Sequence, residues 1–308
     1  MMWYLQSANK STYNCFQFLI ATISKHYGYD YRLIMLELWG FLYDNAENGT
    51  IGDKLKLYWN SKIKRRKYLL NYHGLSFDII AIENLDIENI IHINLLNNPV
   101  ALYIDSFICP WVPFYQKLHR AHAIFILGEK YGKYIFLDQY SNEQGINKID
   151  KCFVKRAALS IIVFNKNENK SLFNLKCLIK ENLDDWKQFG MSNYELFLLD
   201  MKNNFNIEKE IVDDPVSSKL IMLLKNIAED RVNFIEAIEL FEEQLIVNLS
   251  IIKNHLTDIY VRYEKLRAYI IKCSFSRRSC NIETIINELD NIYLQEQKIY
   301  KLMQILTK

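Results

Sequence analysis

The last third of the chain lacks the residues that interrupt helices. No glycine follows Gly190 and no proline follows Pro215 in a sequence of 308 residues. Apolar residues recur in this region at the spacing of one helix face, with charged residues of both signs between them. The two clearest stripes are Phe234, Ile238, Phe241, Leu245 and Leu249, and Ile282, Ile285, Ile286, Leu289 and Ile292. The pattern predicts an antiparallel bundle of helices, the last of which Asn281 can cap.

The first half of the chain has a different pattern. Short runs rich in β-branched and aromatic residues predict strands at residues 77–82, 100–104, 123–127, 134–137 and 159–164. The third and fourth runs form a hairpin with its loop at residues 128–133, and helices are expected over 15–28 and 32–43. The sequence therefore predicts an α+β fold, with a mixed domain of residues 1–170 and an all-helical region of residues 171–308.

Charge and cysteine content narrow the class of protein. Lysine and arginine total 38 against 36 acidic residues, a net charge of +2, so nothing favours nucleic acid or an acidic membrane as a partner. No segment has the apolar length of a membrane span, and the N-terminus does not resemble a secretory signal. The six cysteines are scattered without a short repeated spacing, which indicates free thiols. These features predict a cytoplasmic protein that binds neither nucleic acid nor membrane.

Cys15 is the first candidate for chemistry. It begins a predicted helix, directly after the cap-type residues Ser11, Thr12 and Asn14. The unpaired N–H groups and the dipole of a first helical turn favour a thiolate, and the same N–H groups can bind the oxyanion of a tetrahedral intermediate. Cys15 is therefore a candidate nucleophile. The alternative is a small buried apolar residue at a helix start.

The predicted hairpin supplies a candidate base. His122 begins its first strand, and antiparallel pairing across the turn places position 122 opposite Asp138, or opposite Gln139 if the register shifts by one. A catalytic imidazole needs such a neighbour to fix its tautomer and stabilise its charged form. The alternative is a core histidine that pairs with a carboxylate and has no catalytic role. A metal site of Cys109, His119 and His122 is not expected, because their spacing fits no familiar zinc pattern.

Four segments together carry a resemblance to a known family. They are Cys15 with the apolar helix that ends at Tyr27-Gly28, the run from Asn98 to Asp105, the run from His122 to Gly128, and the run from Tyr134 to Asp138. Their order and spacing are similar to those of the butirosin biosynthesis protein BtrH family. The resemblance covers about the first half of the chain, and its individual motifs are short.

The resemblance implies a papain-like cysteine peptidase fold, in which a helix carrying the cysteine packs on an antiparallel sheet carrying the histidine. It implies that Cys15 is the nucleophile, His122 the base and Asp138 its orienting acid. Members of the family look like enzymes that move an acyl group from the phosphopantetheine thioester of an acyl or peptidyl carrier protein onto a small-molecule amine, often in antibiotic or nonribosomal peptide biosynthesis. No cofactor or metal of the protein's own is expected.

Two further positions follow from the resemblance, and two other functions stay open. Gln6 is the nearest upstream glutamine to complete an oxyanion hole, but its spacing from Cys15 is longer than in papain-like enzymes. Asp105 matches an aspartate of the family, as either a substrate-facing or a turn residue.

A hydrolase of the same fold, or a catalytically silent binding scaffold, would carry the same residues.

Overall fold

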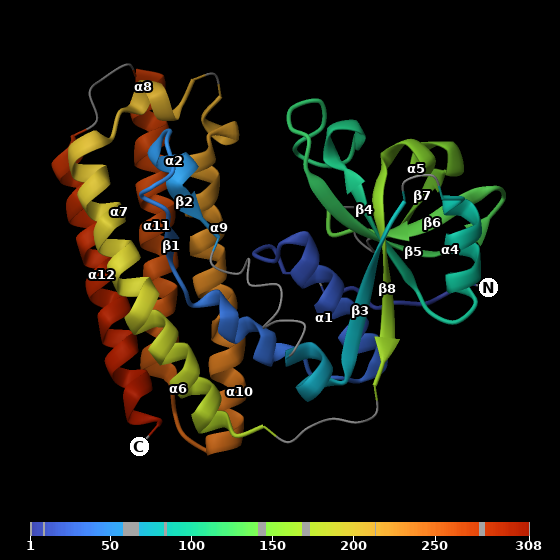
Figure 1. Ribbon diagram of the computed structural model, residues 1–308, viewed down its shortest axis with the longest axis horizontal. Coiled ribbons are helices and arrows are strands. Elements are labelled where there is room, and N and C mark those ends of the chain that lie inside the picture. The colour runs from blue at the N-terminus through green and yellow to red at the C-terminus, as the bar shows by residue number, and fades with distance from the viewer. Residues whose placement is uncertain are drawn as a thin grey trace. The chain divides into compact units, whose positions relative to one another are not determined.

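The computed structural model describes residues 2–8, 10–57, 68–82, 85–140, 146–167, 173–212, 214–276 and 281–307. The chain divides into two compact units (Figure 1). The first consists of Met1–Tyr31 and Arg66–Ser171, and the second of Arg32–Arg65 and Leu172–Lys308. The boundary expected at residue 170 lies outside the described residues. Residues 32–57, which a division at that point assigns to the first domain, pack instead within the helical unit.

The first unit is built around an antiparallel sheet. Within the described residues its strand order is β3 (Leu75–Ala81), β8 (Ala158–Lys166), β4 (Val100–Asp105), β5 (Ala121–Lys130), β6 (Lys133–Leu137) and β7 (Ile146–Asp150). Each run predicted as a strand is one, with somewhat different ends, and β7 was not anticipated. The chain is thus α+β, as the sequence predicts, with an antiparallel sheet in its first half and helices in its C-terminal part.

Helices cover both faces of this sheet (Figure 1). α1 (Cys15–Tyr27) lies against β5, where the rings of Phe18 and Phe125 approach to 6.5 Å between centroids. Side chains alternate between faces along a strand, so the neighbours of Phe125 point the other way. There, α4 (Ile87–Leu95) and α5 (Lys151–Ala157) pack over β4, β5 and β6 to form a continuous apolar core. This double coverage explains why β5 is apolar along most of its length.

The hairpin between β5 and β6 is tighter than predicted. The strands continue to Lys130 and resume at Lys133, so the turn consists of Tyr131 and Gly132 alone, both with positive φ. The register also shifts at Leu127, between the pairs Ile126–Phe136 and Gly128–Ile135. The backbone carbonyl of Leu127 accepts the N–H of Trp3 at 2.7 Å, so the N-terminal segment occupies the hydrogen-bonding position that the bulge exposes.

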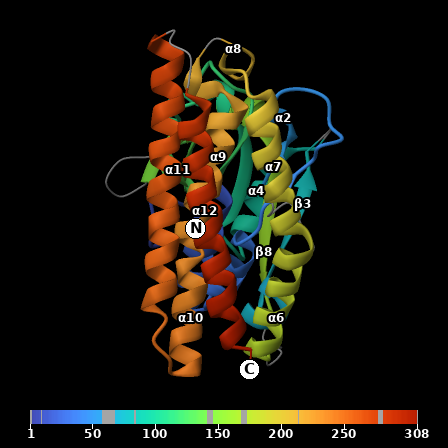
Figure 2. The ribbon, with the colours of Figure 1, turned by 90° about the vertical axis from the view of Figure 1, so that its left-hand side faces the viewer.

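The second unit consists mainly of helices. Its C-terminal helices are α6 (Leu175–Asp185), α7 (Met191–Asn204), α8 (Ile207–Glu210), α9 (Lys219–Asn233), α10 (Ile235–Leu245), α11 (Ser250–Ser276) and α12 (Ile282–Ile305). α9, α11 and α12 lie side by side (Figure 2). Asn281 caps α12 as predicted, accepting from the N–H of Glu283. Over the described residues, the chain has no helix with the length and apolar content that a membrane span requires.

Residues 32–57 contribute short elements to this unit. They form η1 (Arg32–Leu38), a 3-10 helix, then β1 (Leu42–Tyr43), α2 (Ile51–Lys54) and β2 (Leu55–Lys56). The continuous helix expected over 32–43 is therefore wrong beyond Leu38. The backbone carbonyls of Leu38 and Gly40 accept hydrogen bonds from the guanidinium of Arg231, each at 2.8 Å, instead of continuing a helical ladder.

Arg231 belongs to a buried polar cluster that joins this segment to the helices. Its Nε lies 2.5 Å from a carboxylate oxygen of Glu296, and the other oxygen of Glu296 accepts from the indole N–H of Trp39 at 2.6 Å. Both charged side chains are almost completely buried. Burial of a pair is tolerated only when its remaining hydrogen-bonding groups are also satisfied, and here the carbonyls of Leu38 and Gly40 and the indole of Trp39 satisfy them.

The helices of the second unit are interrupted at two points that bear on the sequence prediction. Between α6 and α7 the chain makes a π-helical turn, η5 (Trp186–Gly190). A Cβ atom at Gly190 would lie 2.3 Å from the ring of Trp186, so only glycine allows this close approach. The first predicted stripe is likewise interrupted, because α10 ends at Leu245 and Leu249 stands before α11.

Candidate active site

Cys15 is the first residue of α1, and the residues around it fix the start of that helix. The side-chain oxygen of Asn14 accepts the backbone N–H of Gln17, and the side-chain oxygen of Gln17 accepts that of Asn14, both at 2.9 Å. This reciprocal capping box satisfies two of the N–H groups that a helix start leaves without partners. Cys15 is a free, half-buried thiol in the first turn of this capped helix.

His122 and Asp138 form a buried pair at the end of the sheet that lies near this thiol. His122 is the second residue of β5, opposite Ile104 of β4, and Asp138 directly follows β6. The Nε2 atom of His122 lies 2.7 Å from Oδ2 of Asp138. The two residues are only 6 % and 1 % exposed, so their attraction is little screened by water.

The pairing register behind this contact differs from the predicted one. Phe125 lies opposite Leu137, and continuing that register by one step places Asp138 opposite Ile124. His122 and Asp138 are therefore diagonal neighbours on one face of the sheet, not directly opposite residues. The two-residue turn moves the pairing beyond the predicted register, and the bulge at Leu127 then moves it back by one residue. Diagonal neighbours remain within reach of long side chains, and the hydrogen bond forms.

The electrostatics of His122 link all three side chains. Burial alone lowers the pKa of a histidine, but hydrogen bonds to Asp138 and to Cys15, together with their negative charge, outweigh it and raise the pKa of His122 to about 9. The imidazole contacts the carboxylate through Nε2. At neutral pH the ring is held in its protonated form between the two groups.

The Asp138 carboxylate accepts hydrogen bonds from two further residues that the sequence did not identify as part of the site. The indole N–H of Trp111 donates to Oδ2 at 2.8 Å, and the backbone N–H of Tyr140 donates to Oδ1 at 2.7 Å. The ring of Tyr140 also lies 5.4 Å from that of His122. Trp111 stands in a short loop segment between Pro110 and Pro113. A tryptophan between two prolines is the sequence signal that could have identified it as part of the site.

The remaining sequence candidates lie apart from this group of contacts. Gln6 is exposed. Asp105 accepts the backbone N–H of Phe107 at 3.0 Å, at the start of η4 (Ser106–Ile108), and pairs with His119 at 2.7 Å. The thiol of Cys109 is buried and donates to the backbone carbonyl of Asp105 at 3.1 Å. Asp105 therefore caps a turn, which is one of the two roles that were open, and it is the partner of both Cys109 and His119, whereas His122 pairs with Asp138.

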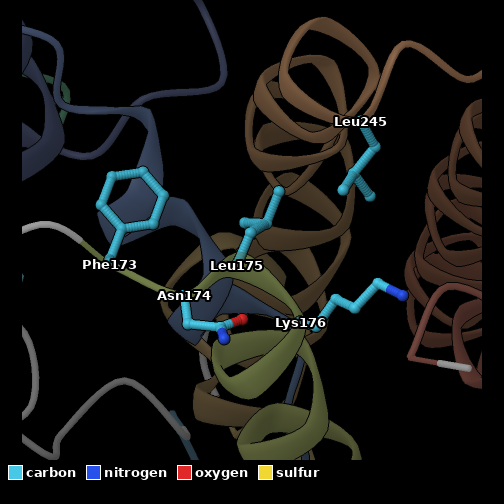
Figure 3. Close-up of a pocket in the computed structure, with 5 residues that line it drawn as sticks. All are labelled: Phe173, Asn174, Leu175, Lys176 and Leu245. Carbon is cyan, nitrogen blue, oxygen red and sulfur yellow. The ribbon is translucent and has the colours of Figure 1, made fainter.

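An open pocket of about 490 Å³ lies elsewhere, in the helical unit. Leu175 of α6 and Leu245 of α10 extend into it, beside Phe173, Asn174 and Lys176 (Figure 3). Lys176 is the one ionisable group among these lining residues, and Asn174 already caps α6. Within the described part of the chain, no three His, Cys, Asp or Glu side chains gather closely enough to bind a metal ion. The pocket therefore offers no set of groups suited to catalysis.

The contacts of Cys15, His122 and Asp138 place a thiol, an imidazole and a carboxylate in series. That order suits a nucleophile whose proton is held by a base, with a third group that orients the base. Comparison with models of protein families and with curated proteins finds nothing that matches this chain. Function is therefore inferred from the side-chain geometry of the first unit.

Proposed function

We propose that the protein is a cysteine-dependent acyltransferase, which forms an amide by moving an acyl group from a thioester to an amine through an acyl-Cys15 intermediate. The observation that carries the proposal is the contact of His122 with both Cys15 and the buried Asp138. A protonated imidazole beside a thiol at a helix start favours the reactive thiolate. A histidine that merely filled the core would need no hydrogen bond to a thiol.

We also propose that the first unit is a papain-like catalytic domain of the BtrH type. Support comes from a helix that carries the cysteine at its first turn, packed on an antiparallel sheet that carries the histidine. By the same resemblance, the acyl donor would be a carrier protein with a phosphopantetheine arm, in the cytoplasm, and the acceptor a small amine. The chain also resembles the amide synthase of closthioamide assembly, for which the same chemistry is expected.

The first step is attack of the Cys15 thiolate on the carbonyl carbon of the thioester. The tetrahedral oxyanion is held by backbone N–H groups at the start of α1, where the N–H of Cys15 itself has no intrahelical acceptor. The carbon–sulfur bond to the donor then breaks. His122 gives its proton to the departing sulfur, so the products are the acyl-enzyme and the free thiol of the donor.

The second step depends on what acylation does to His122. Part of its raised pKa comes from the hydrogen bond and charge of Cys15, and both are lost when the sulfur becomes a thioester. The pKa of His122 therefore falls in the acyl-enzyme, which leaves a neutral imidazole able to take a proton from an incoming amine. Attack of the amine forms the amide and releases the Cys15 thiolate beside the imidazolium. Aminolysis of a thioester runs downhill, so no energy source is needed.

The test is intact-mass spectrometry of the protein after exposure to a panel of acyl thioesters, followed by an amine. We expect an acyl adduct on the wild type and on Cys177→Ala, a control that removes an exposed thiol, and none on Cys15→Ala. Addition of amine should discharge the adduct to an amide.

Two outcomes would contradict the proposal. Discharge to the free acid at the same rate with and without amine would indicate a hydrolase of the same fold. An equal adduct on Cys15→Ala and wild type, or none on either with any donor including a loaded carrier protein, would favour a silent binding scaffold.

A further inference from the structure

Trp111 contacts the same carboxylate oxygen as the catalytic histidine. Oδ2 of Asp138 lies 2.8 Å from the indole nitrogen of Trp111 and 2.7 Å from Nε2 of His122, while Oδ1 accepts the N–H of Tyr140. Two donors on one oxygen compete for its electron density, because each hydrogen bond draws charge that the other would otherwise use. The indole therefore affects the bond between the carboxylate and the imidazole without touching the imidazole itself.

The position of the indole is set by packing that does not involve Asp138. Its ring lies 5.0 Å from the ring of Phe136 on β6 and 5.6 Å from that of Phe153 on α5. Its neighbours in the loop, Cys109 and Val112, are buried in the same core. The N–H of Trp111 is thus a fixed donor aimed at Oδ2, and it restricts the rotation of the carboxylate about its Cβ–Cγ bond.

We propose that Trp111 is a positioning residue for the proposed acyl transfer: its indole N–H fixes Oδ2 of Asp138 and weakens the hold of that oxygen on the imidazolium proton of His122. The inference rests on the proposed function, in which His122 must release its proton to the departing thiol and then act as a base. An imidazolium held too tightly by Asp138 would stay protonated and fail at both steps.

The described residues around this pair include both ionisable and neutral groups. Cys15 on α1 and Asp138 after β6 contact His122, and the phenol ring of Tyr140 lies beside it. Burial, and then the charges of Asp138 and Asp105, raise the pKa of the Cys109 thiol to about 12, so it stays neutral. Removal of the indole N–H changes a contact of Asp138 without changing any charge or backbone group.

The test measures the pKa of His122 by NMR titration of its ring in wild type and in variants at position 111. Trp111→Phe removes the N–H and keeps an aromatic ring. Replacement of Trp111 by 3-benzothienylalanine keeps the full bicyclic ring and exchanges the N–H for sulfur, so it tests the donor even if the phenylalanine variant is destabilised. Trp3→Phe is the matched control, because the indole N–H of Trp3 donates to the carbonyl of Leu95 instead.

We expect the pKa of His122 to rise by about one pH unit in both variants at position 111, a change typical of a lost hydrogen bond to a charged group, and to stay unchanged in Trp3→Phe. The rate of amide formation from a preformed acyl-enzyme should fall at neutral pH, by at most about tenfold, and recover at higher pH, as the neutral imidazole becomes populated. An unchanged or lowered pKa of His122 in the benzothienyl variant would overturn the inference.

The titration separates this inference from the proposed function, because it requires no substrate. If no thioester acylates Cys15 but the pKa still rises, the role of Trp111 in setting the basicity of His122 stands and acyl transfer does not. If acylation and amide formation occur but the pKa is the same in all variants, the acyltransferase stands and Trp111 is a packing residue.

Discussion

Replacement of Asp138 by asparagine removes one negative charge from the site while keeping the shape of the side chain. Asp138 is the first of the influences that raise the pKa of His122, whereas burial lowers it. Without the carboxylate, burial is opposed by Cys15 alone. We therefore expect the pKa of His122 to fall from about 9 by about two pH units, the range typical of the loss of an adjacent opposite charge.

The hydrogen bonds of the carboxylate add a cost in stability. Oδ2 accepts from His122 and Trp111, and Oδ1 accepts from the backbone of Tyr140. An asparagine has one oxygen, so at least one of these donors must face an amide nitrogen. A buried donor left without an acceptor costs about 1–3 kcal/mol in the free energy of unfolding.

The assay for Asp138→Asn is NMR titration of the His122 ring together with chemical denaturation, with Asp78→Asn, an exposed carboxylate of β3, as the control. A His122 pKa near 9 in Asp138→Asn would refute the account of the site, because it would mean that the carboxylate does not hold the proton. A variant as stable as the wild type would refute the account of its hydrogen bonds.

Three further outcomes follow from the same contacts. The pKa of His122 in the folded protein exceeds its ordinary value of 6.5, so the protonated ring contributes on the order of 3 kcal/mol to the free energy of unfolding. This contribution is fully present below pH 6.5 and is lost as the pH rises through about 9. Chemical denaturation at a series of pH values measures it. Cys15→Ala should lower the pKa of His122, as NMR titration would show, and a higher value would contradict the thiol contact. Arg231→Met should lower the free energy of unfolding by about 3–5 kcal/mol, because it leaves the buried carboxylate of Glu296 without its cation. An Arg231→Met protein with an unchanged melting temperature would show that the pair is not structurally important.

Local sequence patterns were sufficient for the elements that hold the candidate site. The cap residues before Cys15 and the glycine at position 28 predict α1 with both of its ends, and the α1 of the structure runs over Cys15–Tyr27 with Gly28 in the left-handed region. The continuous apolar run of residues 123–127 likewise predicts β5. These features depend on neighbours within a few residues, which the sequence displays directly.

Features that depend on distant residues were not predictable. The bulge at Leu127 accompanies pairing with Trp3, far away in the sequence, and it changes the register by which His122 meets Asp138. The helix expected over 32–43 stops early because Arg231 takes the carbonyls of Leu38 and Gly40. The donor role of Trp111 likewise requires a loop and a strand to meet. No local pattern encodes such partners.

The most direct measurement of the central claim compares the reactivity of individual thiols. Cys152 and Cys177 are exposed, whereas Cys15 is half-buried but contacts His122. Limited labelling with iodoacetamide at pH 6 to 7, read by peptide mass spectrometry, should modify Cys15 first, and His122→Ala should abolish that preference. Labelling of Cys15 no faster than that of Cys152 and Cys177 would contradict the account, because it would show that the histidine does not activate the thiol.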